Sequence, residues 1–214
     1  MSYRDSVTST ITAISKAALD ARAELDRIQK ARESNRQSLV GRIVGDEGYK
    51  QRNAELDTEE GAARSRFSDA VGKAMGDYQA ARAYHFTPRP RQVSPETMQF
   101  LSLIDLTREE AGRLILDAKN KEQNYTLARM VYTNVQRQGI DMHDDSAAYL
   151  ERCDKEVSYF ADTCASMLQD SSGAYARAYG EILADVTKEV NDASAAYLGS
   201  TGVTSGGVPV EGSE

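Results

Sequence analysis

The apolar positions near the N-terminus follow a helical repeat. Spacings of four and three residues alternate along residues 7–28, which is the heptad pattern of a helix with one buried stripe. A two-stranded coiled coil and a helical hairpin would both bury this stripe, and we expect it to mediate self-association into a homo-oligomer. The stripe consists of Val7, Ile11, Ile14, Ala18, Ala21, Leu25 and Ile28. The next positions in register are Arg32, Asn35 and Leu39, whose polar members weaken the stripe or fix its register.

Three glycines interrupt the pattern after this stripe. Gly41, Gly45 and Gly48 lie close together, and each would cost about 0.5–1 kcal/mol relative to Ala inside a helix. They predict a Gly-rich break at 41–48, after which a second helix runs from near Tyr49 toward Tyr84. Residues 1–86 are therefore predicted to form a long helical arm, coiled-coil-like, with one break.

Prolines separate this arm from the rest of the chain. In "TPRPR" each X-Pro pair disfavours helix at the preceding residue, which predicts an extended Pro/Arg linker over 87–94. Ser94 is placed to cap a new helix with Pro95 at its first position. Arg89 and Arg91 could dock the acidic surface of a partner; the alternative is two solvated arginines on a linker.

Short apolar segments with clear start and stop signals follow the linker. Thr107 with Glu110 matches a capping box, and Gly139 is a natural helix stop. Two longer amphipathic helices are predicted, one over 144–169 and one from Ser171 or Ser172 to Tyr197. The sequence thus predicts an all-α fold with a helical bundle over 95–198. The Gly/Ser-rich end, 199–214, is predicted to be disordered or ordered only by a partner.

Composition narrows the functional classes. The chain has 214 residues and a net charge of -7, and residues 141–214 carry 4 Lys/Arg against 14 Asp/Glu, a net of -10. This acidity disfavours nucleic acid and anionic lipid as partners and favours a basic protein surface or simple solubility. We expect no membrane span, because no apolar run is long enough, and no cleaved export signal at the N-terminus.

Residues suited to catalysis are few. Cys153 and Cys164 are eleven residues apart in a helical pattern, about 16 Å along one helix, so we expect two buried, reduced thiols. His143 lies among the carboxylates of "DMHDD", where a helix begins, and helix capping explains these acids better than metal binding. We therefore predict no catalytic residue, no bound cofactor and no metal site.

One stretch carries a resemblance. Residues 101–141, "LSLIDLTREEAGRLILDAKNKEQNYTLARMVYTNVQRQGID", combine a Thr-x-x-Glu cap, the run "KEQNYT", Arg129 and a helix that ends at Gly139-Ile140. This stretch resembles a helical module in small proteins from the structural-gene cluster of tailed phages and prophages of Gram-positive bacteria. The likeness covers about a fifth of the chain, and its motif is one of capping and packing.

The resemblance implies a function. It suggests a non-catalytic, scaffolding-like or virion-associated protein that binds a phage structural protein such as the capsid. Its place would be the host cytoplasm during assembly, or the virion. The acidic C-terminal third departs from the scaffolding pattern, which often ends in a basic capsid-binding helix. The main alternative is a bacterial adaptor or regulatory coiled-coil protein that binds a basic protein, and a small enzyme is a distant third.

Overall fold

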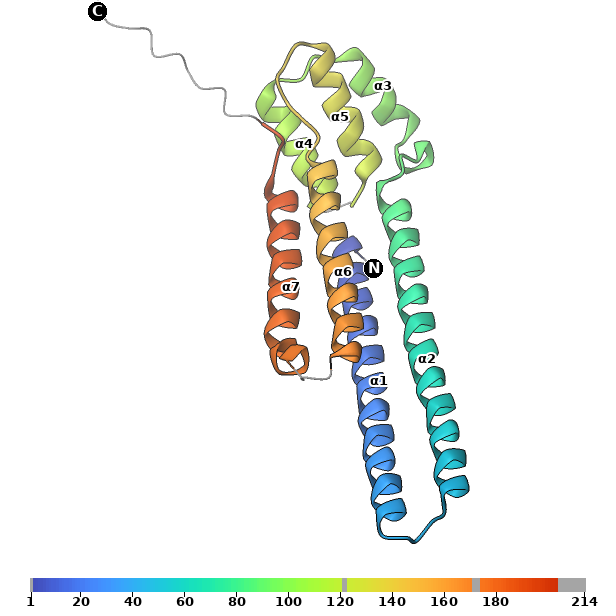
Figure 1. The fold of residues 1–214 in the computed structure, drawn as a ribbon. Coiled ribbons are helices and arrows are strands. Elements are labelled where there is room, and N and C mark those ends of the chain that lie inside the picture. The colour runs from blue at the N-terminus through green and yellow to red at the C-terminus, as the bar shows by residue number, and fades with distance from the viewer. Residues whose placement is uncertain (1, 121–122, 171–173, 204–214) are drawn as a thin grey trace, which may run out of the picture. The chain divides into compact units, whose positions relative to one another are not determined.

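Helices make up the computed structural model, which describes residues 2–120, 123–170 and 174–203 (Figure 1). The all-α fold predicted from the sequence is confirmed within these residues. Among the described residues no helix is both long enough and apolar enough to cross a bilayer. In chain order the elements are α1 (Tyr3–Val40), α2 (Asp46–Phe86), the 3-10 helix η1 (Pro90–Gln92), α3 (Pro95–Leu103), α4 (Arg108–Asn120), α5 (Tyr125–Arg137), α6 (Ser146–Gln169) and α7 (Ala174–Gly199).

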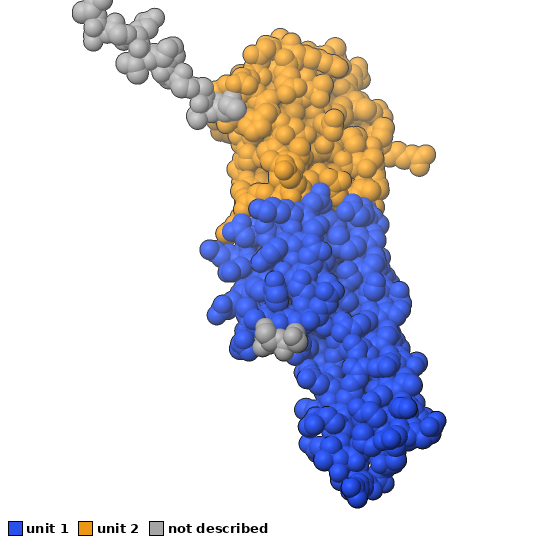
Figure 2. Space-filling model, in the orientation of Figure 1, with its two compact units in different colours: residues 1, 3–80, 154–189 blue, residues 2, 81–153, 190–214 orange. Residues whose placement is uncertain are grey.

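The chain divides into two compact units (Figure 2). Unit 1 comprises residues 3–80 and 154–189, and unit 2 comprises residues 81–153 with the chain from Val190 onward. This division differs from the sequence-based one, which placed the boundary at 87–94. The reason is that α2, α6 and α7 are each long enough to contribute residues to both units.

In unit 1, α1 and α2 form a long helical hairpin, with parts of α6 and α7 beside it (Figure 1). The Tyr3 hydroxyl donates to Tyr78 at 2.9 Å, and Tyr78 donates to Asp154 of α6 at 2.6 Å. A third hydrogen bond, of 2.5 Å, joins the hydroxyls of Ser15 of α1 and Tyr179 of α7. Residues from all four helices therefore contact one another within this unit.

This packing covers the heptad stripe within a single chain. Of the seven side chains predicted to mediate self-association, six are buried and Leu25 is half-buried. Of the two arrangements that the stripe allows, the structure adopts the helical hairpin. A coiled coil between two chains would need these same side chains to leave their present contacts. Self-association stays a prediction, and in this fold it would use another surface.

Toward its tip the hairpin changes from apolar to polar pairing. Among the described residues, Ile28 is the buried side chain of α1 nearest the tip, and Leu56 is the buried side chain of α2 nearest the tip. Beyond Ile28, Arg32 forms salt bridges across to α2, with Asp57 at 2.5 Å and with Glu60 at 2.7 Å. The Asn35 amide, which the heptad register placed in the stripe, donates to Asn53 Oδ1 and to the Tyr49 carbonyl, both at 3.1 Å. These polar positions of α1 thus pair with polar groups of α2.

The turn between the two helices is shorter than predicted. It covers 41–45, and α2 already begins at Asp46, so Gly48 lies inside the helix and not in the break. Asp46 and Glu47 lie in the first turn of α2, where carboxylates stabilise the positive end of the helix dipole. Arg42 has a positive φ of 57°, and its side chain is exposed.

The segment predicted as an extended linker is packed on unit 2. It contains η1, and Val93 is buried. The Arg89 N–H donates to Thr126 Oγ1 at 2.8 Å, and the Asn124 amide donates to the Gln92 carbonyl at 2.7 Å. The prolines exclude α-helix here, but the polar groups at the start of α5 hold the segment in place.

This difference predicts the order of proteolysis. Trypsin should cut after Arg42 before it cuts after Arg91, because exposed turns without packing are the usual nicking sites. The early fragments can be identified by mass spectrometry, with digestion of urea-unfolded protein as the control for intrinsic site preference. Earlier cleavage after Arg91 would show that the linker opens readily in solution.

Several of the predicted helix ends in unit 2 are confirmed. Ser94 Oγ accepts the Thr97 N–H at 3.1 Å, with Pro95 at the first helical position. Thr107 and Glu110 cap α4 reciprocally, with N–H to oxygen distances of 2.9 and 3.3 Å. Helix α5 ends at Arg137, and Gly139 follows with a φ of +78°. These ends depend on local chemistry, and local chemistry is readable from sequence.

The core of unit 2 lies between α3, α4, α5 and the loops around them. Its buried members are Leu101, Leu106, Ala111, Ile115, Val131, Tyr132, Val135 and Met142. An aromatic cluster lies at the start of α6 and the end of α7, where Tyr149 and Tyr197 stack with ring centroids 4.6 Å apart. The Phe86 ring lies 5.9 Å from the Tyr197 ring and 5.2 Å from the Tyr125 ring, measured between centroids.

Candidate functional site

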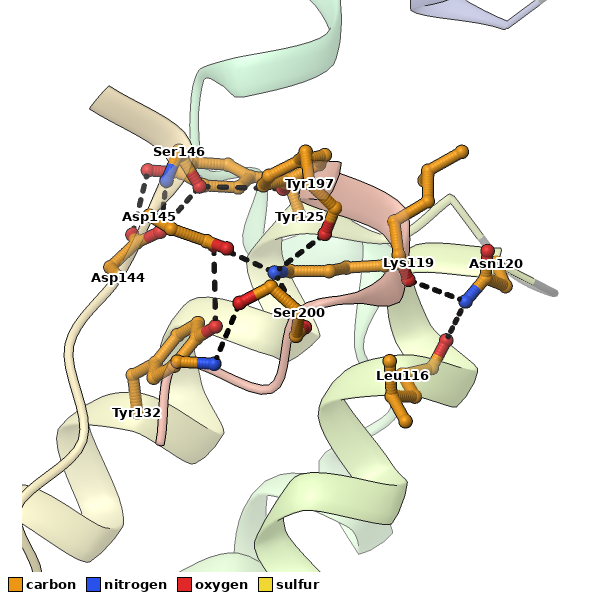
Figure 3. Close-up of polar contacts among 12 residues, drawn as sticks. Leu116, Lys119, Asn120, Tyr125, Tyr132, Asp144, Asp145, Ser146, Tyr197 and Ser200 are labelled. Atoms are coloured by element: carbon orange, nitrogen blue, oxygen red, sulfur yellow. Dashed lines mark hydrogen bonds and ion pairs between the residues drawn. The ribbon is translucent and has the colours of Figure 1, made fainter. Parts of the chain in front are cut away.

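A buried lysine lies at the centre of a polar cluster in unit 2 (Figure 3). The Lys119 side chain is only 1% exposed, and its Nζ lies 2.7 Å from Asp145 Oδ1. The ammonium also donates to the carbonyls of Tyr197 and Ser200, both at 3.1 Å. All three of its N–H donors are therefore satisfied. The Tyr197 ring lies beside the cation, 4.2 Å from Nζ to the ring centroid.

Three elements bring these groups together. Lys119 is at the end of α4, Asp145 directly precedes α6, and Tyr197 and Ser200 are at the end of α7 and just beyond it. Burial lowers the pKa of the Lys119 ammonium, and Asp145 counters this only in part. Burial likewise raises the pKa of Tyr197, so this phenol is neutral at physiological pH. These contacts join the end of α4 to the start of α6 and the end of α7, so the cluster fastens the three helices together.

The chain after α7 is part of the same arrangement. The Gly202 carbonyl oxygen accepts a hydrogen bond from the His143 N–H at 2.9 Å, and Met142 and Val203 form an isolated antiparallel bridge. Gly202 has a φ of +69°, and a Cβ there would lie 2.1 Å from the His143 carbonyl oxygen. The sequence predicts that 199–214 is disordered or ordered only by a partner; in the structure its first residues, 199–203, include these contacts, and we call them the C-terminal strap. The rest of that prediction, 204–214, lies outside the described residues.

The "DMHDD" acids do not gather around a common point. Asp144 Oδ1 accepts the Ser146 N–H at 3.0 Å at the start of α6, while Asp145 binds Lys119. Within the described part of the chain no group of three or more His, Cys, Asp or Glu side chains is arranged to hold a metal ion. Cys153 and Cys164 are buried thiols that form no disulfide, as the sequence predicts. Burial raises the pKa of the Cys164 thiol to about 12, which suppresses its thiolate at neutral pH.

Unit 2 also contains a groove of about 630 Å³ between α3 and α5. Its apolar lining consists of Pro88, Met98, Leu101, Ile104 and Met130. Its polar lining consists of Ser102, Asp105, Thr126, Arg129, Thr133, Asn134, Arg137 and Gln138. An apolar floor with charged groups at the edge is the usual composition of a protein-binding groove. We call this feature the α3–α5 groove.

Amide side chains hold the two walls of this groove together. The Asn134 amide of α5 donates to the Leu101 carbonyl of α3. The Gln138 carbonyl oxygen accepts the Leu106 N–H at 3.1 Å, while the Gln138 amide donates to Asn134 Oδ1. At the other end Thr126 accepts the Arg89 N–H and donates to Gln92 Oε1 at 2.9 Å. The walls are therefore held at a fixed spacing by the chain itself.

The two arginines predicted to contact a partner lie close to this groove in sequence. The guanidinium of Arg89 lies over the Tyr84 ring at 4.2 Å, directly after the groove-lining Pro88. Arg91 is exposed within η1. Nothing in the sequence marks Arg129 and Arg137 as contact residues. Their spacing of eight residues places them on one face of α5, but in the sequence that face resembles an ordinary solvated surface.

The residues that carry the phage-module resemblance have structural roles in this unit. Asn124 caps α5 by accepting the Leu127 N–H at 3.0 Å, and Thr126 binds the linker. The Tyr125 hydroxyl accepts a hydrogen bond of 2.8 Å from Arg129. Comparison of the chain with protein-family models, with curated proteins and with solved structures found no match. The fold and sites thus define an all-α protein with a helical hairpin and a grooved helical unit.

Proposed function

We propose that this chain is a non-catalytic assembly protein that binds another protein through the α3–α5 groove of unit 2. One contrast carries the proposal. The ionisable groups of the Lys119 cluster are engaged in holding helices together, whereas the α3–α5 groove combines an apolar floor with exposed arginines. A surface of this kind suits a protein partner, because apolar burial supplies affinity and the charges supply orientation.

The resemblance of residues 101–141 to a phage structural module supports the choice of partner. On this proposal the partner is a virion structural protein such as the capsid, met in the host cytoplasm during assembly or kept in the virion. Self-association into a homo-oligomer belongs to the same proposal, and it would present several grooves at once and raise avidity. The acidic residues from Asp141 onward would add contacts to a basic patch of the partner.

The second candidate is a bacterial adaptor or regulatory protein. The net charge of -10 over residues 141–214 favours it, because an acidic helical surface suits a basic protein partner. Genes on either side separate the two candidates. A neighbouring portal or capsid gene favours assembly, whereas a cellular regulatory locus favours the adaptor.

Co-expression tests the assembly proposal. The full chain, produced with the structural protein encoded beside it, should co-purify with that protein and change the size or uniformity of the particles seen by electron microscopy. The structural protein expressed alone is the control. Identical particles with and without the chain, together with its absence from purified virions, would contradict the assembly function and leave the adaptor.

A further inference from the structure

We propose that the α3–α5 groove receives an acidic, amphipathic helix of the partner protein. This inference rests on the proposed function, which it deepens by giving the chemistry of the segment that binds. It follows from three properties of the groove: its apolar floor, the charge along its edge and its fixed width.

The floor offers apolar surface that the chain itself leaves incompletely covered. Leu101 is already buried in the core of unit 2, whereas Met98, Ile104 and Met130 are half-buried and line the groove. Methionine side chains adapt to the shape of what they contact, and they suit a surface that must accept branched apolar side chains. The volume of about 630 Å³ lies in the range of roughly 300–1,000 Å³ that is typical of ligand sites.

The edge of the groove is positive. Arg129 and Arg137 are exposed, and in the described part of the chain neither forms a salt bridge with a carboxylate; Arg129 donates instead to the Tyr125 hydroxyl. Arg89 and Arg91 extend this charge past Pro88. Asp105 is the carboxylate in the groove lining. A partner segment with carboxylates is therefore attracted, and a basic segment is repelled.

The spacing of the charges favours a helix. Arg129 and Arg137 are eight residues apart on α5, which is about 12 Å along the axis. Two acidic residues seven or eight positions apart on a second helix that lies along α5 would meet both arginines. The apolar face of that helix would lie between α3 and α5, which is the helix-in-groove mode of recognition.

The fixed width of the groove lowers the cost of binding. The amides of Asn134 and Gln138 hold α3 against α5, and Thr126 holds the linker at the other end. The groove walls therefore lose little conformational entropy when the partner binds. Less of the favourable interaction free energy is offset by that loss.

Fluorescence anisotropy with designed peptides tests the inference. The probe is a labelled helical peptide of about 18 residues, five turns, with Leu along one face and Glu flanking it. The full-length protein should bind this peptide. Its affinity for a control peptide in which Lys replaces every Glu should be at least about tenfold weaker. R129Q and R137Q should each weaken binding about three- to fivefold, and added salt should weaken it further.

Two further variants separate groove binding from general charge attraction. R113Q removes the same charge from an exposed site on α4 outside the groove and should leave affinity unchanged. Thr133→Trp fills the groove at an exposed lining position and should abolish binding, while circular dichroism should show a folded chain. Equal binding of both peptides, equal loss with R113Q and R137Q, or unaltered binding by Thr133→Trp would each overturn the inference.

The remaining outcomes are also decisive. Tighter binding of a single-stranded oligonucleotide than of the acidic peptide would assign the arginines to phosphate recognition and overturn the inference. If the peptide fails but the neighbouring structural protein still co-purifies with the chain, the assembly function stands and the acidic-helix inference falls. If both fail, the proposed function falls with it.

Discussion

Lys119→Met should lower the free energy of unfolding by about 3–5 kcal/mol, because it leaves one member of a buried ion pair without its partner. The Asp145 carboxylate is only 16% exposed, and it would lose the 2.7 Å contact with Nζ. The carbonyls of Tyr197 and Ser200 would also lose their shared donor. Urea denaturation followed by circular dichroism measures the change, and near-ultraviolet dichroism reports the tyrosines around the cluster.

A double variant shows how the loss arises. Burial lowers the pKa of Lys119, which means that desolvation outweighs the attraction of Asp145. The pair is therefore costly to break but contributes little net stability, and K119M/D145N should recover about half of the loss. R113Q removes an exposed salt bridge with Glu109 on the same helix and should change stability little. A K119M variant as stable as the wild type would show that the cluster does not fasten the three helices.

The features that the sequence predicts correctly are those that depend on neighbours along the chain. The hairpin stripe follows from a heptad repeat, and the caps at Ser94 and Thr107 follow from hydrogen bonds across three residues. The polar heptad position Asn35, expected either to weaken the stripe or to fix its register, pairs with Asn53 on α2 of the same chain.

The features that the sequence did not predict depend on distant contacts. Lys119 and Ser200 are 81 positions apart, and a lysine near the end of a helix is usually solvated. The Gly/Ser composition of 199–214 is typical of a flexible tail, so nothing local indicates that Gly202 lies against His143. Arg129 and Arg137 looked like a solvent-facing row because α3, which makes the opposite wall of the groove, comes from another segment.

The length of the helices explains why the two compact units are divided differently from the predicted domains. Prolines are reliable breaks in a helix, and 87–94 is indeed a break between α2 and α3. A break in a helix is not a boundary between compact units, however. The hydrogen bonds of Thr126 and Asn124 hold this segment on unit 2, whereas the boundary falls inside continuous helices.

Gly202→Ala should destabilise unit 2 by about 3–5 kcal/mol, because a positive φ and a backbone collision act at the same residue. The added Cβ would lie 2.1 Å from the His143 carbonyl oxygen and 2.6 Å from the Tyr132 ring. The backbone oxygen cannot move aside as a flexible side chain could, so the C-terminal strap must leave its site. That movement would break the hydrogen bond from the His143 N–H and uncover Met142. Urea denaturation gives the stability, and hydrogen exchange at His143 reports the strap directly.

Gly139→Ala is the matched control for this variant. Gly139 also has a positive φ, +78°, but a Cβ there would meet nothing within 4 Å. Its replacement should cost only the backbone term, about 1–2 kcal/mol, and leave exchange at His143 unchanged. The difference in free energy of unfolding between the two variants measures the effect of the backbone collision alone. Both substitutions could lower stability equally while the His143 N–H stays protected from exchange. That result would show that the strap adjusts to the added methyl group and that its contacts do not contribute to the stability of unit 2. If Gly202→Ala alone exposes His143, the residues just after α7 are an integral part of the fold that carries the groove.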